Sequence, residues 1–213
     1  MKSLALLLAL SAPAFAAVTY TLPGTTESGT WTFNRTNYPV ATYNGEFPNA
    51  ANPWGAPAAV SSGSSSALLN KVSGSSAYMA SGGFMYTAGT SSSFTLSDSS
   101  PLASLATIVF QGKISDDFSG APTFSYNGGT QALAADFTTV WTAAGYPDRA
   151  WQWDLTGISV PITSYEINFT GHFAANSFTL DASDTFAQVI PEPTSALLGF
   201  AALSFTCIRR RRA

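Results

Sequence analysis

Residues 164–173 read SYEINFTGHF, and this stretch decides the fold class. Apolar and polar side chains alternate along it, so one side of an extended chain carries Tyr165, Ile167, Phe169 and Phe173, and the other carries Ser164, Glu166, Asn168, Thr170 and His172. A period of two is that of a β-strand, and one apolar with one polar face fits an antiparallel sheet that is wet on one side. We therefore predict a half-buried antiparallel strand here.

Shorter segments repeat this alternation. The apolar pairs are Tyr20 with Leu22, Trp31 with Phe33, Phe84 with Tyr86, Phe94 with Leu96, Ile108 with Phe110, Phe124 with Tyr126, and Phe178 with Leu180. Turn-forming residues separate them at Pro23-Gly24, Asn44-Gly45, Gly82-Gly83, Asn127-Gly128-Gly129 and Ala175-Asn176-Ser177. Many short strands at this spacing predict an all-β fold, a two-sheet antiparallel sandwich that is jelly-roll-like.

Two stretches show no clear period, and helix and loop both stay open for them: residues 58–71, which are rich in serine, and residues 132–144. Residues 44–66 carry three prolines and a Ser-Ser-Gly-Ser-Ser-Ser run, so we expect a long surface loop there.

Charge is scarce and unevenly placed. Only 10% of the 213 residues are charged, whereas 46% are hydrophobic. Between Ala17 and Ile190 four basic residues stand against eleven acidic ones, a net charge of about −7. Four basic residues are too few to neutralise the phosphates of a nucleic acid, which argues against a nucleic-acid partner. The only cysteine is Cys207, near the C-terminus, so no disulfide and no cysteine-rich zinc site can form within one chain.

The N-terminus has the order of a secretory signal peptide. Lys2 precedes an apolar run from Leu4 to Leu10, and an Ala-x-Ala site follows at Ala14 and Ala16. We predict a signal-peptide helix over residues 1–16 with cleavage between Ala16 and Ala17, which requires a secretion translocon and a signal peptidase as partners. The alternative is a buried N-terminal helix.

The C-terminus has the order of a short membrane anchor. Residues 194–208 carry no charge and are followed by four basic residues, Arg209, Arg210, Arg211 and Arg212. Basic residues stay on the cytoplasmic side, so the domain before them lies outside the cytoplasm. Fifteen helical residues rise only about 22 Å, less than the roughly 30 Å of a bilayer core. We predict a short transmembrane helix over about 194–208, and with it membrane contact through the tail.

The motif Pro191-Glu192-Pro193, the apolar run from Ala196 to Leu203 and the terminal arginines together resemble the PEP-CTERM sorting signal. The resemblance covers only about the last two dozen residues. It implies recognition of Pro191, Glu192 and Pro193 by an exosortase, a membrane cysteine protease-transpeptidase of Gram-negative bacteria that make exopolysaccharide. It also implies delivery to the cell surface or the medium. The chain thus divides into residues 1–16, an extracytoplasmic β domain over 17–188 and a sorting tail over 189–213, and the alternative for the tail is an ordinary anchor.

No catalytic motif stands out between the two ends. His172 is the only histidine, and no Gly-x-Ser-x-Gly elbow is present, which argues against a Ser-His-Asp hydrolase. Paired carboxylates suffice for glycoside hydrolysis. The candidates are Asp116, Asp117, Asp148, Asp154 and Glu166. Because any acidic domain supplies such residues, we predict that the protein is not an enzyme.

Metal and cofactor signals are weak. Asp116-Asp117 and the pair Asp181 and Asp184 could supply oxygen ligands to calcium, but no EF-hand loop is present and solvated turn aspartates explain them as well. We predict no metal and no cofactor, with calcium as the alternative.

Tryptophan offers the best hint of a ligand. Trp151 and Trp153 point to the same side of an extended chain, Trp141 and Tyr146 lie close by in sequence, and Trp54 lies in the proline-rich stretch. Exposed rings of this kind could bind sugars, although two indoles at period two also fit a hydrophobic core. Trp151 and Trp153 are therefore candidate carbohydrate contacts whose exposure decides between the two interpretations.

Together these features predict an exported cell-envelope or matrix protein with a non-enzymatic structural or adhesive β domain. The alternatives are a carbohydrate-binding module and a glycan hydrolase. Extracellular polysaccharide is the expected surface partner.

Overall fold

The structure is a computed structural model that describes residues 20–38, 57–74, 77–80, 82–87, 89, 91–115, 118–141 and 148–190, and of Trp141 only the backbone. Several predicted features lie outside these residues. They are the signal peptide with Ala14, Ala16 and Ala17, the residues Trp54, Asp116, Asp117 and Tyr146, and the tail with Pro191, Glu192, Pro193 and Arg209–Arg212.

The described residues form strands, turns and loops but no helix. The strands are β1 (Thr26–Thr32), β2 (Ala58–Ala59), β3 (Ser62–Gly63), β4 (Leu68–Gly74), β5 (Ala77–Ala80), β6 (Phe84–Thr87), β7 (Ser92–Asp98), β8 (Thr107–Ile114), β9 (Thr123–Tyr126), β10 (Leu133–Ala134), β11 (Phe137–Trp141), β12 (Asp148–Asp154), β13 (Tyr165–Gly171) and β14 (Ala174–Ser183).

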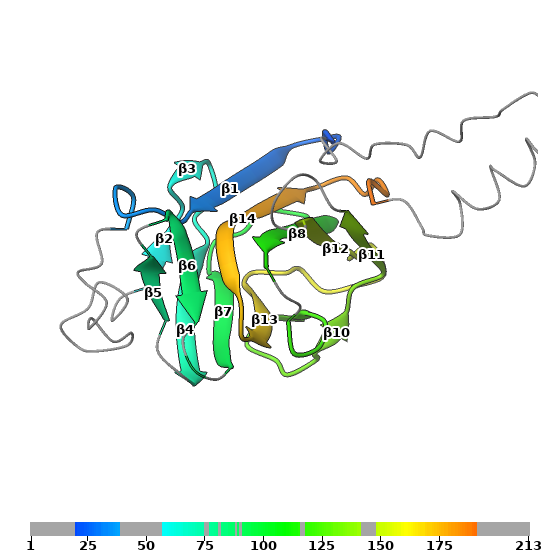
Figure 1. The fold of residues 1–213 in the computed structure, drawn as a ribbon. Coiled ribbons are helices and arrows are strands. Elements are labelled where there is room, and N and C mark those ends of the chain that lie inside the picture. The colour runs from blue at the N-terminus through cyan, green and yellow to red at the C-terminus, as the bar shows by residue number, and fades with distance from the viewer. Residues whose placement is uncertain are drawn as a thin grey trace, which may run out of the picture.

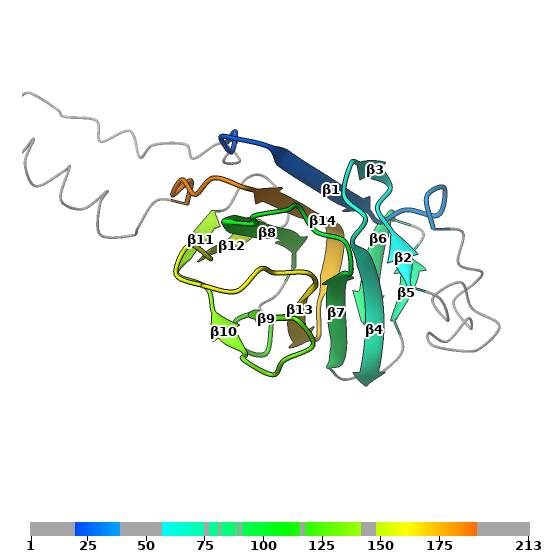
Figure 2. The same cartoon turned by 180° about the vertical axis from the view of Figure 1, so that it is seen from behind.

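Two antiparallel sheets hold these strands, consistent with a sandwich (Figures 1 and 2). The larger sheet has the order β11-β12-β8-β14-β1-β3, and β6 pairs with the start of β14 and with β5. The smaller sheet has the order β10-β9-β13-β7-β4-β2. The all-β prediction with two antiparallel sheets is therefore confirmed.

Consecutive strands seldom lie in the same sheet. Apart from the hairpins β5–β6, β9–β10 and β11–β12, each step along the chain from one strand to the next crosses to the other sheet. The central strand of the larger sheet is β14, which pairs with β8 on one side and with β1 and β6 on the other. Most pairing is therefore between segments far apart in the sequence.

Aromatic side chains from both sheets fill the space between them. Phe110 and Phe178 of the larger sheet meet Phe169 of the smaller one, each with ring centroids 5.3 Å apart. Phe118 lies closer still, 4.8 Å from Phe169. Along β13 the residues Tyr165, Ile167 and Phe169 are buried while Glu166 is exposed. The strand predicted at residues 164–173 is thus confirmed, and its apolar side forms part of the core.

The outer face of the larger sheet carries a second, smaller hydrophobic cluster. Leu22 before β1 and Ile190 after β14 pack there against Val109 of β8 and Ala150 of β12. Tyr20, Phe137 and Val189 border this cluster. Both ends of the described chain therefore lie on one face of the larger sheet and leave at the same end of the molecule (Figure 1).

Three local predictions are wrong. Ala175-Asn176-Ser177 is not a turn but an irregularity inside β14, where the register with β8 shifts by one residue, because pairing on both sides keeps the chain extended. The turn falls instead at His172 and Phe173. Residues 58–71 and the described part of the second stretch, residues 132–141, are neither helices nor plain loops, since they contain β2, β3 and part of β4, and β10 and β11 respectively. Tyr20 and Leu22 pack on the larger sheet without forming a strand.

Candidate functional site

Trp151 and Trp153 belong to the core. Their exposed fractions are 8% and 1%. Trp151 stacks on Phe110 and Phe118, with centroids 5.6 and 5.2 Å apart. The core interpretation of these tryptophans is confirmed, and an open sugar platform at Trp151 and Trp153 is wrong, because both side chains are buried.

The described candidate acids do not gather in one cleft. Asp148 and Asp154 stand at opposite ends of β12, which places their backbones about 20 Å apart. Glu166 is in the other sheet and lines a cavity to which neither aspartate contributes. The inverting and retaining glycosidase geometries both need two carboxyl groups within about 10 Å. Asp148 and Asp154 therefore do not form such a pair.

Asp181 and Asp184 lie close in sequence but have different surroundings. Tyr20 donates its hydroxyl to Oδ2 of Asp181 at 2.8 Å, and burial raises the pKa of this carboxyl. Asp184 Oδ1 accepts the backbone N–H of Thr25 at 2.9 Å, and hydrogen bonds from Thr25 lower its pKa. Both carboxyls already accept protein donors. In the part of the chain that the structure describes, no three side chains from His, Cys, Asp and Glu come together as a metal site would require.

His172 is exposed, as predicted, but it lies at the turn between β13 and β14 and not on the face of a strand. Its Nε2 lies 3.2 Å from the hydroxyl of Tyr86, and the ring of Tyr86 in turn lies edge-on to that of Tyr78, with centroids 5.7 Å apart. The rings of His172, Tyr86 and Tyr78 thus form a small aromatic cluster on the outer side of the β5–β6 hairpin.

On the outer face of the smaller sheet, strands β7 and β13 carry mostly short polar side chains, whereas Leu68 and Val72 of the neighbouring β4 are exposed and apolar. Strand alternation points Ser93, Thr95 and Ser97 of β7 away from the core, next to Thr170, Asn168 and Glu166 of β13. The hydroxyls of Ser93 and Thr170 lie 2.9 Å apart, and Thr95 donates to Oδ1 of Asn168 at 2.6 Å. These cross-strand contacts hold the side chains in fixed positions. We call this surface the polar face: Ser93, Thr95, Ser97, Thr123, Ser125, Glu166, Asn168 and Thr170.

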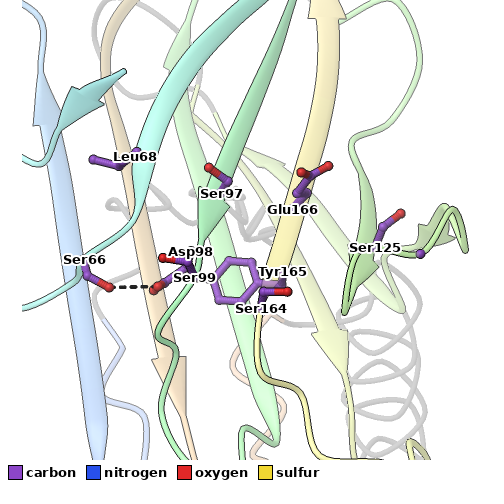
Figure 3. A pocket seen from close by; sticks show the side chains of 11 residues that line it. Ser66, Leu68, Ser97, Asp98, Ser99, Ser125, Ser164, Tyr165 and Glu166 are labelled. Carbon is purple, nitrogen blue, oxygen red and sulfur yellow. Dashed lines mark hydrogen bonds between the residues drawn. The ribbon is translucent and has the colours of Figure 1, made fainter. Parts of the chain in front are cut away.

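One end of the polar face opens into a cavity of about 280 Å³ (Figure 3). Six strand residues line it, namely Leu68, Ser97, Asp98, Ser125, Tyr165 and Glu166, together with the loop residues Ser66, Ser99, Gly128, Gly129 and Ser164. Serine hydroxyls both donate and accept, so this lining suits a ligand rich in hydroxyl groups.

The inner wall of this cavity is acidic. Asp98 is 2% exposed, and its Oδ1 accepts the hydroxyl of Ser66 and the N–H of Ser100, both at 2.8 Å. Its Oδ2 is buried, and the hydroxyl of Tyr165 lies near the carboxyl group. Burial first, and then the charges of Asp98 and Glu27, raise the pKa of the neighbouring Tyr165 hydroxyl. No basic side chain is among the described residues that line the cavity, so the site disfavours anionic ligands.

The rim of the cavity is braced by Asn127. Its amide nitrogen donates to the carbonyl of Pro161 at 2.8 Å, and its Oδ1 accepts the N–H of Thr163 at 2.8 Å. Asn127 adopts a φ of 52°, in the left-handed region that asparagine tolerates better than most residues. The turn after β9 is thereby tied to the segment that leads into β13.

A second hollow of about 360 Å³ lies further along the same face. Its lining includes Ser93, Thr95, Asn168 and Thr170, the residues that form the cross-strand contacts. The sequence pattern placed Asn168 and Thr170 on the wet side of their strand, which is confirmed. The contributions of Ser66, Asp98 and Gly128 were missed, because loops from distant parts of the chain bring them together.

Among the described residues, no helix has the length and apolar character needed to cross a membrane. No family model matches the chain, and no curated protein and no solved structure matches it either.

Proposed function

We propose that the chain is an exported cell-envelope or extracellular-matrix protein whose β domain is non-enzymatic and adhesive. The order of features at the two ends of the sequence supports export, namely a signal peptide over residues 1–16 and a PEP-CTERM-like tail over 189–213. A translocon, a signal peptidase and an exosortase-type transpeptidase are the proposed processing partners. The proposed destination is the cell surface or the medium, reached through transient or lasting anchorage in the inner membrane.

The observation that carries the adhesive role is the polar face. The larger sheet is packed on both sides, by the core and by the two ends of the described chain. The polar face of the smaller sheet instead presents ordered hydroxyl and amide groups beside two hollows. A rigid, nearly uncharged surface loses little conformational entropy when it binds an extended polar ligand. We infer that the domain contacts a neutral glycan chain there.

Carbohydrate binding as the main role is the second candidate function, because the same face would serve a dedicated module. A glycan hydrolase is the less favoured candidate, because Asp148 and Asp154 are too far apart along β12 to act as a catalytic pair. We also infer a jelly-roll-like connection of the strands, which the alternation of successive strands between the two sheets supports.

The export proposal is tested by intact-mass analysis of the protein from native cells, separated into membrane, surface and medium fractions. We expect a species outside the cell that begins at Ala17 and ends near Pro191. A membrane-bound species that keeps Arg209 to Arg212 would show that the tail is a simple anchor.

The adhesive role is tested by electrophoresis in native gels that contain a soluble neutral polysaccharide. We expect the gel to retard the wild-type protein, and the double variant Thr95→Ala with Asn168→Ala to lose most of that retardation. Thr138→Ala, an exposed threonine on β11 in the other sheet, is the matched control. Equal retardation of all three proteins would refute a role for the polar face.

A further inference from the structure

Residues 185–190 form a strap across the outer face of the larger sheet, and the side chain of Gln152 holds it. Gln152 lies on β12 with an exposed fraction of 0%. Its Nε2 donates to the carbonyl of Ala187 at 2.7 Å, and its Oε1 accepts the N–H groups of Val189 and Ile190 at 3.0 and 3.3 Å. A single amide side chain thus satisfies three backbone groups of the strap, as a neighbouring strand would.

Apolar contacts fix the strap at two further points. Ile190 is 1% exposed and packs with Leu22, Val109 and Ala150. Phe186 stacks on Phe137 of the edge strand β11, with ring centroids 6.2 Å apart. The backbone is therefore held by hydrogen bonds and the side chains by burial, up to and including Ile190.

The N-terminal end of the described chain is held beside the strap. The hydroxyl of Tyr20 donates to Asp181 and accepts from Nε2 of Gln111, both at 2.8 Å. Leu22 belongs to the same cluster as Ile190. In the sequence, the next residue after Ile190 is Pro191, the first of the Pro-Glu-Pro motif. The Pro-Glu-Pro motif therefore follows Ile190 directly in the sequence.

We propose that the strap sets the C-terminal boundary of the processed protein, with Gln152 as its positioning residue. A protease binds several residues of its substrate in an extended, accessible form, which a segment with bonded amides and buried side chains does not offer. Cleavage adds one water across a peptide bond and leaves a carboxylate on the domain and an amine on the tail. That bond must then lie beyond Ile190, and the released domain keeps its strap. This inference rests on the proposed processing of the tail.

The test is limited digestion of the purified full-length protein, in mild detergent, with thermolysin or proteinase K, followed by intact-mass analysis. We expect the resistant wild-type product to retain every residue through Ile190. In Gln152→Ala, the three backbone groups lose their partner, and we expect cleavage inside residues 185–190 to become at least about tenfold faster.

Two further variants keep the result interpretable. Gln111→Ala is the matched control, because it removes a glutamine that contacts Tyr20 and not the strap. Its C-terminal boundary should equal that of the wild type. Ile190→Ser loosens the strap without changing any residue of β12, so it replaces Gln152→Ala if that variant does not fold. We expect Ile190→Ser also to be cut within 185–190.

Rapid cleavage of the wild type inside residues 185–190, or the same boundary in Gln152→Ala and Ile190→Ser as in the wild type, would overturn the inference. Failure of the proposed function is a separate result. Native protein that keeps its tail would refute processing in the cell, whereas protection through Ile190 in the digestion would still establish the strap.

Discussion

The indole N–H of Trp153 donates to the backbone carbonyl of Leu133 at 3.1 Å. Trp153 lies on β12 in the larger sheet and Leu133 on β10 in the smaller one. This hydrogen bond therefore links the two sheets while the ring, 1% exposed, fills the space between them. A buried indole needs a partner for its N–H. Here the partner is a carbonyl of β10, the short strand that pairs with β9.

Truncation of Trp153 should separate the packing of this ring from its hydrogen bond. We expect Trp153→Ala to lower the free energy of unfolding by about 3–5 kcal/mol, because it leaves a large cavity. Trp153→Phe keeps most of the apolar contact and loses the donor, for a cost of about 1 kcal/mol. Urea denaturation of both variants measures the two effects. If Trp153→Ala lowered the free energy of unfolding by less than Trp153→Phe does, the result would contradict the burial described.

Asp181 should make the protein less stable as the pH rises. Burial raises the pKa of its carboxyl in the folded state above the ordinary value of 3.8. Between 3.8 and the raised value, the unfolded chain releases the proton first, so the free energy of unfolding falls with increasing pH. Asp181→Asn cannot titrate, and its oxygen can still accept from Tyr20. We therefore expect its stability relative to the wild type to increase across this window and then to level off, as measured by urea denaturation at several pH values.

Asp184 provides the opposite case in the same experiment. Its pKa is lowered by the hydrogen bonds from Thr25, so its contribution to stability is present above 3.8 and is lost as the pH falls through the lowered folded value. We expect the stability of Asp184→Asn relative to the wild type to decrease as the pH rises to 3.8. If the relative stabilities of the Asp181 and Asp184 variants changed in the same direction with pH, the raised pKa of Asp181 and the lowered pKa of Asp184 could not both be right.

Gly63 should be far less tolerant of alanine than Gly120. Both adopt positive φ angles, 115° and 101°. A Cβ on Gly63 would lie 2.2 Å from the carbonyl oxygen of Ser28, whereas a Cβ on Gly120 would meet nothing within 4 Å. We expect Gly120→Ala to cost about 1–2 kcal/mol, the cost of the left-handed backbone alone. Gly63→Ala carries this cost and also displaces β3 from β1. Thermal unfolding of the two variants gives the comparison, and equal losses would rule out the steric contribution.

Sequence patterns predicted strands that contain a pair of large apolar residues two positions apart. β13 and β7 both bury every second residue, and both were expected from their apolar pairs. β2, β3 and β10 contain two residues each, too few to show a period, and their positions depend on pairing with distant strands. Asn176 was misassigned to a turn because its local preference was overridden by the pairing of β14 with β8.

The candidate sites were less accessible to sequence reasoning. The wet side of β13 was identified, since alternation alone separates Asn168 and Thr170 from the core. The exposure of tryptophans was not decidable, because period two fits both a core and an open platform. Gln152, flanked by two core tryptophans, would be expected to face solvent. It is buried because the strap covers it, and a contact between residues 37 positions apart leaves no local signal.

The last two strands of the part of the chain that the structure describes occupy the middle of the two sheets, β13 between β9 and β7, and β14 between β8 and β1. The smaller sheet cannot close around its centre until residues through Gly171 are free to pair, and the larger sheet cannot do so until residues through Ser183 are free. For a chain that crosses a membrane unfolded and N-terminus first, this order delays folding until only the strap and the tail remain behind. Slow assembly, which non-local pairing also favours, would then keep the chain competent for transport. Folding and completion of export would thus coincide in time.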